Sequence, residues 1–156
     1  MKRFVLAMAG ARPLAILLAG LGAGLTIYVL LLLHDTTKLA LLVPSFGASC
    51  ALVFGVPGSP FARPLSVIGG HLVASAMGLI VLAVLGHGAA AMAVGVGLGI
   101  AAMLATRTMH PPAGGDPLIV IAVGATPWFL LTPILAGTVV IVALGYAYRR
   151  TIARSG

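Results

Sequence analysis

Charged residues are scarce in this chain of 156 residues. Only 7% of its residues are charged, whereas 61% are hydrophobic. A soluble domain carries roughly a quarter charged residues, so this chain has too few charges to cover a water-exposed surface. Its apolar stretches have lengths of about 20 residues, which is what a helix needs to cross the hydrocarbon core of a bilayer. The sequence therefore predicts a polytopic integral membrane protein, occupying residues 1–156 as a single transmembrane domain.

The chain also lacks the residues of a disulfide, a metal centre or a common catalytic centre. Its single cysteine, Cys50, has no partner for a disulfide or a zinc site. Two acidic residues in total are too few for a carboxylate-rich metal site, and no Ser-His-Asp set is recognisable. We predict no catalytic residues, no metal and no cofactor. An intramembrane enzyme that uses His71, His110 and Asp116 is the best case for catalysis, and we expect instead that the chain is not an enzyme.

The net charge of +7 raises the question of nucleic-acid binding. The basic residues do not form one patch, however, because they lie at the termini and in the gaps between apolar stretches. This distribution is typical of membrane topology signals. The expected partner is therefore the lipid bilayer and not a nucleic acid.

Six apolar segments follow one another along the chain. All are expected to be helical or partly helical, because an open strand cannot satisfy its backbone hydrogen bonds in lipid. The second and fifth segments are interrupted by proline and glycine. The segments are 14–33, 39–56, 66–85, 89–106, 111–124 and 128–148.

The basic residues distinguish six crossings from a model in which the two interrupted segments re-enter on the same side. If segments two and five are re-entrant, Lys38, Arg63 and Arg107 all lie outside. If all six cross, only Lys38 lies outside, which the positive-inside rule favours. We therefore predict six spans in the inner or plasma membrane with both termini cytoplasmic. The basic residues then inside are Lys2, Arg3, Arg12, Arg63, Arg107, Arg149, Arg150 and Arg154.

The two interrupted segments resemble each other. The stretches at 44–49 and 111–116 both have the pattern Pro-x-x-Gly-small-(Ser/Asp), and an apolar run of seven residues follows each. The chain thus divides into halves of three spans, at about 14–86 and 87–150. Because three is odd, the second half is expected to be inverted. Interrupted segments at matching positions in inverted halves indicate a transporter binding site.

Each interrupted segment is predicted to be an irregular stretch followed by a short helix. Asp116 followed by Pro117 favours a helix start, with the aspartate as the N-cap, and Ser49 is the matching cap in the first half. In the inverted arrangement the two short helices meet N-terminus to N-terminus near mid-membrane. Two helix N-termini that face one cavity favour a small anion.

Three short motifs carry a family resemblance. The run Thr108-Met109-His110-Pro111-Pro112-Ala113-Gly114-Gly115 resembles the signature of the HPP family of integral membrane proteins. The block at 44–49 and the block Ser66-Val67-Ile68-Gly69-Gly70-His71-Leu72 resemble two further motifs of that family, in the same order. The resemblance covers about residues 10–150. It implies small-anion transport without fixing the substrate, because cyanobacterial and plastid relatives are associated with nitrite transport.

The candidate substrate-binding residues come from these motifs, and several have a second interpretation. His110 is either a ligand or proton group or the anchor of the Pro-Pro turn. Asp116 is protonated when an anion binds, marks a cation or proton site, or only caps its helix; Arg107 attracts anions or anchors the topology. The serines at 45 and 49 either donate to the anion or cap. The full set is Ser45, Gly47, Ser49, His71, His110, Gly114, Gly115 and Asp116.

The sequence thus predicts a transporter for a small inorganic anion such as nitrite. A secondary carrier coupled to protons is favoured, with Asp116 as the coupling group. An anion channel and a non-transport membrane module for sensing or assembly stay open as alternatives. A homo-oligomer is expected, because six short spans provide little buried interior.

Overall fold

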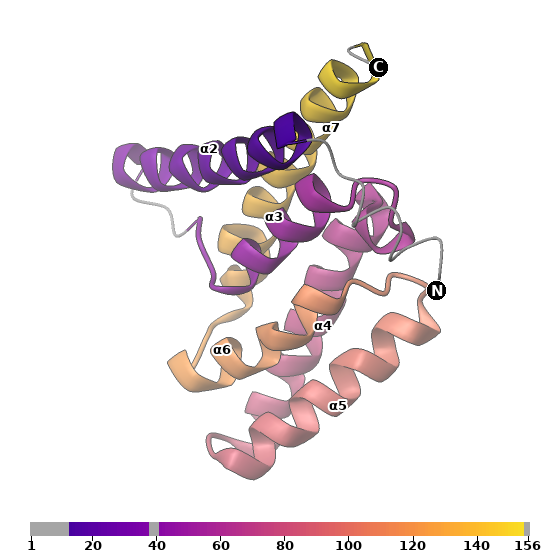
Figure 1. The fold of residues 1–156 in the computed structure, drawn as a ribbon. Coiled ribbons are helices and arrows are strands. Elements are labelled where there is room, and N and C mark those ends of the chain that lie inside the picture. The colour runs from indigo at the N-terminus through magenta and orange to yellow at the C-terminus, as the bar shows by residue number, and fades with distance from the viewer. Residues whose placement is uncertain (1–12, 38–40, 155–156) are drawn as a thin grey trace.

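The computed structural model describes residues 13–37 and 41–154, and every regular element within these ranges is helical (Figure 1). This agrees with the predicted all-helical class. Lys2, Arg3, Arg12 and Lys38, four of the predicted topology signals, lie outside the described residues. The main helices are α2 (Pro13–Thr37), α3 (Ser45–Gly55), α4 (Pro64–Leu85), α5 (Ala89–Ala105), α6 (Asp116–Val123) and α7 (Ala136–Arg154).

Four short helical turns connect the main helices. Three are turns of 3-10 helix, and the fourth is a kinked segment interrupted at Thr132. Most begin with a proline at the first position, where its missing N–H costs nothing. They are η1 (Pro60–Ala62), η2 (Pro111–Gly115), η3 (Pro127–Leu130) and η4 (Leu131–Leu135).

Three helices among the described residues are long and apolar enough to cross a membrane. They are Pro13–Thr37, Pro64–Leu85 and the kinked segment Pro127–Arg150. Three shorter apolar helices, Ser45–Gly55, Ala89–Ala105 and Pro111–Val123, lie between them. In each group of three main helices the middle one is the shortest. The lengths are 25, 11 and 22 residues in the first half and 17, 8 and 19 in the second. Six crossings and an inverted repeat stay predictions.

The start of α3 corrects the sequence prediction. The helix begins at Ser45 with Pro44 as its N-cap, four residues before the predicted cap Ser49. Ser49 lies inside the helix, and its Oγ lies 3.1 Å from the carbonyl oxygen of Ser45. The proline and glycine of this block do not prevent a helix, because a proline at or before the first turn is tolerated.

The start of α6 confirms one prediction and corrects another. The helix begins at Asp116, with Pro117 in its first turn, as predicted. However, the N-cap is Gly115, and no side chain caps the helix. The predicted irregular stretch upstream is the 3-10 turn η2. The Asp116 carboxylate is therefore available for contacts with other helices.

The sixth predicted segment is not one continuous helix. Thr132 has the extended backbone angles φ −134° and ψ 121°, and it separates the turns at 127–131 from α7. Pro133 follows it, and a proline removes a helical hydrogen bond. The regular part of this segment therefore begins only at Ala136.

Glycines allow α6 to lie very close to α4 and α5. A Cβ at Gly78 of α4 would lie 2.9 Å from the Pro117 Cα, and Cβ atoms at Gly95 and Gly99 of α5 would lie 3.1 and 3.3 Å from the Pro117 ring. Gly95 and Gly99, which are four residues apart, thus let α5 pack closely against α6. The matching pair Gly20 and Gly24 on α2 has nothing within 4 Å of an added Cβ.

Two interiors result from this arrangement. An apolar core lies between α2, α3 and α7, with Leu30, Phe46, Val53, Phe54 and Ile141 among its buried residues. A second interior lies between α3, α4 and α6, where the short helices cross the middle of the molecule (Figure 1). The second interior contains the candidate site.

Candidate functional site

The first residues of the two short helices are in contact. The Ser45 hydroxyl at the start of α3 donates to the Asp116 Oδ1 at the start of α6, with the oxygens 2.6 Å apart. From this contact the two helices run in opposite directions (Figure 1). Residues 71 positions apart in the chain are therefore brought together, as the matched blocks predicted.

Asp116 is the acidic centre of a buried polar cluster. Its side chain has no solvent exposure, and its Oδ2 lies 2.6 Å from the His71 Nδ1. The Ser75 hydroxyl donates to the same Oδ2 at 3.2 Å. Three side chains from α3 and α4 thus satisfy the carboxylate, which does not turn back onto its own helix N–H groups.

Ser49 connects the two histidines of the cluster. Its Oγ lies 2.8 Å from the His71 Nε2 and 2.9 Å from the His110 Nε2. The two imidazole rings lie 5.1 Å apart, and the edge of the Phe46 ring covers His71. All three polar side chains are fully buried. A continuous line of hydrogen bonds therefore runs from Asp116 through His71 and Ser49 to His110.

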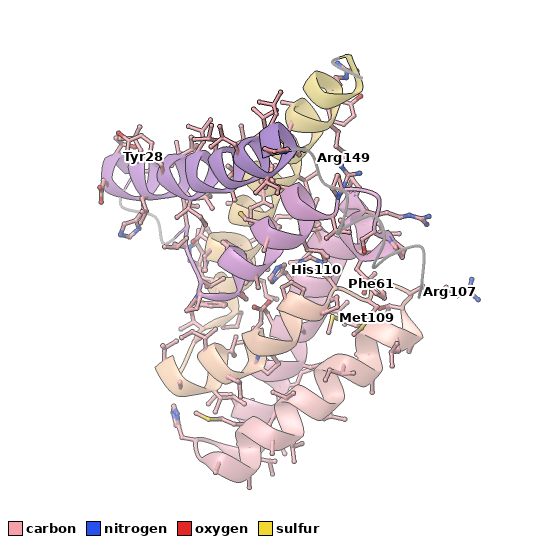
Figure 2. The ribbon with its side chains drawn as sticks, in the orientation of Figure 1. Tyr28, Phe61, Arg107, Met109, His110 and Arg149 are labelled. Atoms are coloured by element: carbon pink, nitrogen blue, oxygen red, sulfur yellow. The ribbon has the colours of Figure 1, made fainter. Side chains whose placement is uncertain are left out.

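His110 ends this line on a loop of the first half. Its Nδ1 lies 2.8 Å from the main-chain carbonyl of Phe61 in η1, 49 positions away in the sequence. The ring therefore binds a distant loop and not its own Pro-Pro turn. Arg149 of α7 donates to the neighbouring carbonyl of Ala62 at 2.7 Å. Figure 2 shows His110 near the centre of the molecule, with Phe61 close to it and Arg149 above both.

Two glycines explain how His110 reaches the cluster. A Cβ at Gly70 would lie 2.7 Å from the His110 Cβ and 2.8 Å from the carbonyl oxygen of Thr108, and one at Gly69 would lie 2.7 Å from the Thr108 side chain. The segment before η2 can therefore lie directly on α4. The Gly-Gly-His sequence of α4 thus supplies both the space and one member of the cluster.

An open depression adjoins the cluster at its Asp116 end. Its volume is about 490 Å³ and its lining is largely apolar, with Ser45 as the one lining residue that has a polar side chain. Ser45 is thus in contact with both the depression and the buried carboxylate. The lining residues are Pro44, Ser45, Met92, Pro112, Gly115, Leu118, Ile119 and Ala122.

The structure brings together five of the eight predicted site residues: Ser45, Ser49, His71, His110 and Asp116.

The other three, all glycines, do not join this cluster. Gly47 is exposed with open space around it, Gly114 faces Ile100 of α5, and Gly115 lines the depression. Arg107 points away from the cluster into the surroundings (Figure 2). An attraction of anions by Arg107 would therefore act at the surface.

Sequence reasoning missed two members of the cluster. Ser75 lies four residues after His71 on α4, and this spacing places both on one helix face, so it was a detectable signal. The Phe61 carbonyl is a main-chain acceptor, and the residue type at that position does not predict its role. Among the described residues, no group of three His, Cys, Asp or Glu side chains is arranged to hold a metal ion.

Comparison with known proteins agrees with the membrane assignment. The chain matches the model of the HPP transmembrane region over residues 8–155. Two proteins of Dictyostelium discoideum, each named only as a transmembrane protein, are 34% identical to it over 126 and 124 residues, which are 73% and 72% of this chain. The chain spans only 44% and 40% of the length of these curated relatives. No solved structure matches the chain. The family match confirms the resemblance seen in the three motifs, and the chain therefore belongs to the HPP transmembrane family of membrane proteins.

Proposed function

We propose that this chain is a secondary transporter for a small inorganic anion, with nitrite as the first candidate, and that transport is coupled to protons. The observation that carries the proposal is the contact between the two ionisable side chains His71 and Asp116, whose Nδ1 and Oδ2 are 2.6 Å apart and fully buried. Ionisable residues inside a membrane are costly and mark substrate or proton pathways by default. The nitrite-associated relatives implied by the HPP resemblance support an anion as the substrate.

The start of the two short helices is the proposed anion site. A helix N-terminus favours an anion, but the Phe46 and Gly47 N–H groups at the start of α3 already donate to the carbonyls of Val43 and Pro44, so a side-chain hydroxyl is the donor proposed here. Ser45 lines the depression, and its hydroxyl donates to Asp116. An anion in the depression could take the Ser45 hydroxyl as a donor if Asp116 released it.

Charge links the anion to a proton in this proposal. An ionised Asp116 repels an anion that approaches Ser45, and the low dielectric of the interior strengthens the repulsion. A protonated Asp116 does not. Anion and proton therefore favour each other's binding, and such linkage is reciprocal. This is the coupling that a symporter needs.

The proposed membrane arrangement is six spans in two inverted halves, in the cell inner membrane, with both termini cytoplasmic. The eight-to-one distribution of basic residues supports it. Single cysteines placed at Arg63 and Arg107 in a Cys50-free background test it. Both positions should react with a membrane-impermeant thiol reagent only from the cytoplasmic side, and labelling from outside would replace six crossings with re-entrant segments.

Flux into proteoliposomes that contain the full chain tests the function. We expect uptake of at least one of nitrite, nitrate, formate, bicarbonate and sulfate that saturates, shows counterflow and increases with an inward proton gradient. Uptake without saturation or counterflow would indicate a channel. No uptake or exchange of any of the five would indicate a non-transport module for sensing or assembly.

A further inference from the structure

The buried cluster contains a hydrogen-bond conflict that only an additional proton removes. The His110 Nδ1 faces the carbonyl of Phe61, which can only accept, so this nitrogen carries a hydrogen. In neutral His110 the Nε2 is then an acceptor, because a neutral imidazole has one donor and one acceptor nitrogen. The Nε2 faces Ser49. Ser49 is therefore required to donate its hydroxyl hydrogen to His110.

His71 also requires the hydroxyl hydrogen of Ser49 when Asp116 is ionised and both histidines are neutral. If Asp116 is ionised and His71 is neutral, the His71 Nδ1 carries the hydrogen that binds the Oδ2. The His71 Nε2 is then also an acceptor facing Ser49. Ser49 has one hydroxyl hydrogen and two acceptors, at 2.8 and 2.9 Å. One of the two buried nitrogens would then lack a donor, which is unfavourable for a polar atom shielded from water.

We propose that Asp116, His71, Ser49 and His110 form a proton relay that holds one proton more than an ionised aspartate with two neutral histidines. With this proton on the Asp116 Oδ2 or on the His71 Nδ1, the His71 Nε2 donates to Ser49 and Ser49 donates to His110. With the proton on the His110 Nε2, that nitrogen donates to Ser49 and Ser49 donates to His71. Every hydrogen then has one acceptor in all three states.

The net charge of the cluster also favours one excess proton. With one excess proton the cluster is neutral overall, whereas without it the cluster carries a net negative charge. Two excess protons would let Ser49 donate to the Ser45 carbonyl at 3.1 Å but would leave a net positive charge in the interior. A buried net charge is far more costly than a neutral pair. Among the described residues Arg149 is the charged group bound to the same loop, through Ala62, and it does not touch the cluster.

Movement of the proton along the line needs no other reactant. As the His71 Nε2–H bond breaks, a new Ser49 Oγ–H bond forms. The former Ser49 Oγ–H bond breaks, and the His110 Nε2–H bond forms. The relay thus joins the Ser45 depression at one end to the Phe61 loop at the other. It deepens the proposed function, because it names the groups that would carry the coupled proton, but its test does not require transport.

Nitrogen-15 NMR of the histidines in the full chain, together with infrared spectroscopy of Asp116, counts this proton. Asp35 is the other of the two acidic residues, so an Asp35→Asn chain labelled with carbon-13 aspartate reports Asp116 alone. We expect one excess proton, seen as an imidazolium at His71, as a protonated Asp116 or as an imidazolium at His110, and a neutral His110 in the first two cases. An ionised Asp116 with both histidines as neutral Nδ1–H forms would overturn the proposal.

The variants Ser49→Ala and Ser75→Ala test whether Ser49 connects Asp116 to His110. Both remove a buried hydroxyl from the cluster, but only Ser49 lies between the rings. In the parent chain and in Ser75→Ala, adding Asp116→Asn should change the nitrogen-15 signals of His110. In Ser49→Ala this response should be lost, and its persistence there would overturn the relay.

If Ser49→Ala does not fold, the proton count in the parent chain still decides. An unchanged proton count in a chain that moves no anion would refute the proposed function and leave the relay in place.

Discussion

The two interiors of this molecule are built on opposite principles, although α3 contributes to both. On one side α3 presents Phe46, Val53 and Phe54 to an apolar core between α2 and α7. On the other it presents Ser45 and Ser49, four residues apart, to the ionisable groups of α4 and α6. In the apolar core shape decides the fit and similar volumes can replace each other. In the polar interior each hydrogen has one designated acceptor, so substitutions of equal size are not equivalent.

Loss of one member of the buried His71–Asp116 pair should give the largest effect on stability. His71→Leu has a similar volume but leaves Asp116 buried without its histidine partner. Breaking a buried pair in this way costs roughly 3–5 kcal/mol. Thermal unfolding in detergent should therefore show a strongly lowered midpoint. Asp116→Asn is the control, because the amide can still donate to the His71 Nδ1, and an equal loss in both variants would contradict a role of charge.

Phe46→Ala should give the next largest effect and tests the apolar interior. The ring is fully buried and lies against both Gly137 and His71. Its removal leaves a cavity, and we expect a loss of about 3 kcal/mol, the lower end of the range for such substitutions. The lower end applies because lipid is as apolar as the core. Phe46→Leu should restore most of the stability in the same unfolding assay. An equally severe loss with leucine would show that ring contact, and not volume, decides.

Gly70→Ala should give a smaller effect that falls on the polar interior. The added Cβ would meet the His110 Cβ at 2.7 Å and a backbone oxygen at 2.8 Å, so the chain around His110 has to shift. Overpacking of this kind costs about 1–3 kcal/mol. Gly97→Ala on α5 is the matched control, since nothing lies within 4 Å of its added Cβ. It should be neutral or slightly stabilising, and equal effects of the two substitutions would contradict the close approach.

The residues of the polar interior were more predictable from the sequence than the hydrogen bonds that join them. The motifs identified Ser45, Ser49, His71, His110 and Asp116 because polar residues are rare in an apolar chain. Their partners were not predictable, because each hydrogen bond joins segments that are far apart, such as the 71 positions between Ser45 and Asp116. The predicted caps failed for this reason, since local rules assign a serine or aspartate to its own helix. The side chains of Ser49 and Asp116 instead contact residues of other segments.

The helix boundaries show the same division between local and tertiary information. The fourth predicted segment, 89–106, ends within one residue of α5 (Ala89–Ala105), because glycine precedes the helix and apolar residues fill it. The sixth segment was predicted as one span at 128–148, but Thr132 breaks it. Pro133 was visible in the sequence. Composition alone did not tell whether it would kink the helix or delay its start.

Transport by Asp116→Asn in proteoliposomes tests the central claim most directly. The asparagine amide can replace the protonated carboxyl, donating to the His71 Nδ1 from the Oδ2 position while its oxygen still accepts from Ser45. The variant should therefore keep anion exchange at a rate similar to the parent chain but lose the acceleration of uptake by an inward proton gradient. Gradient-driven uptake that is unchanged in Asp116→Asn would contradict the claim that this buried carboxylate couples protons to the anion.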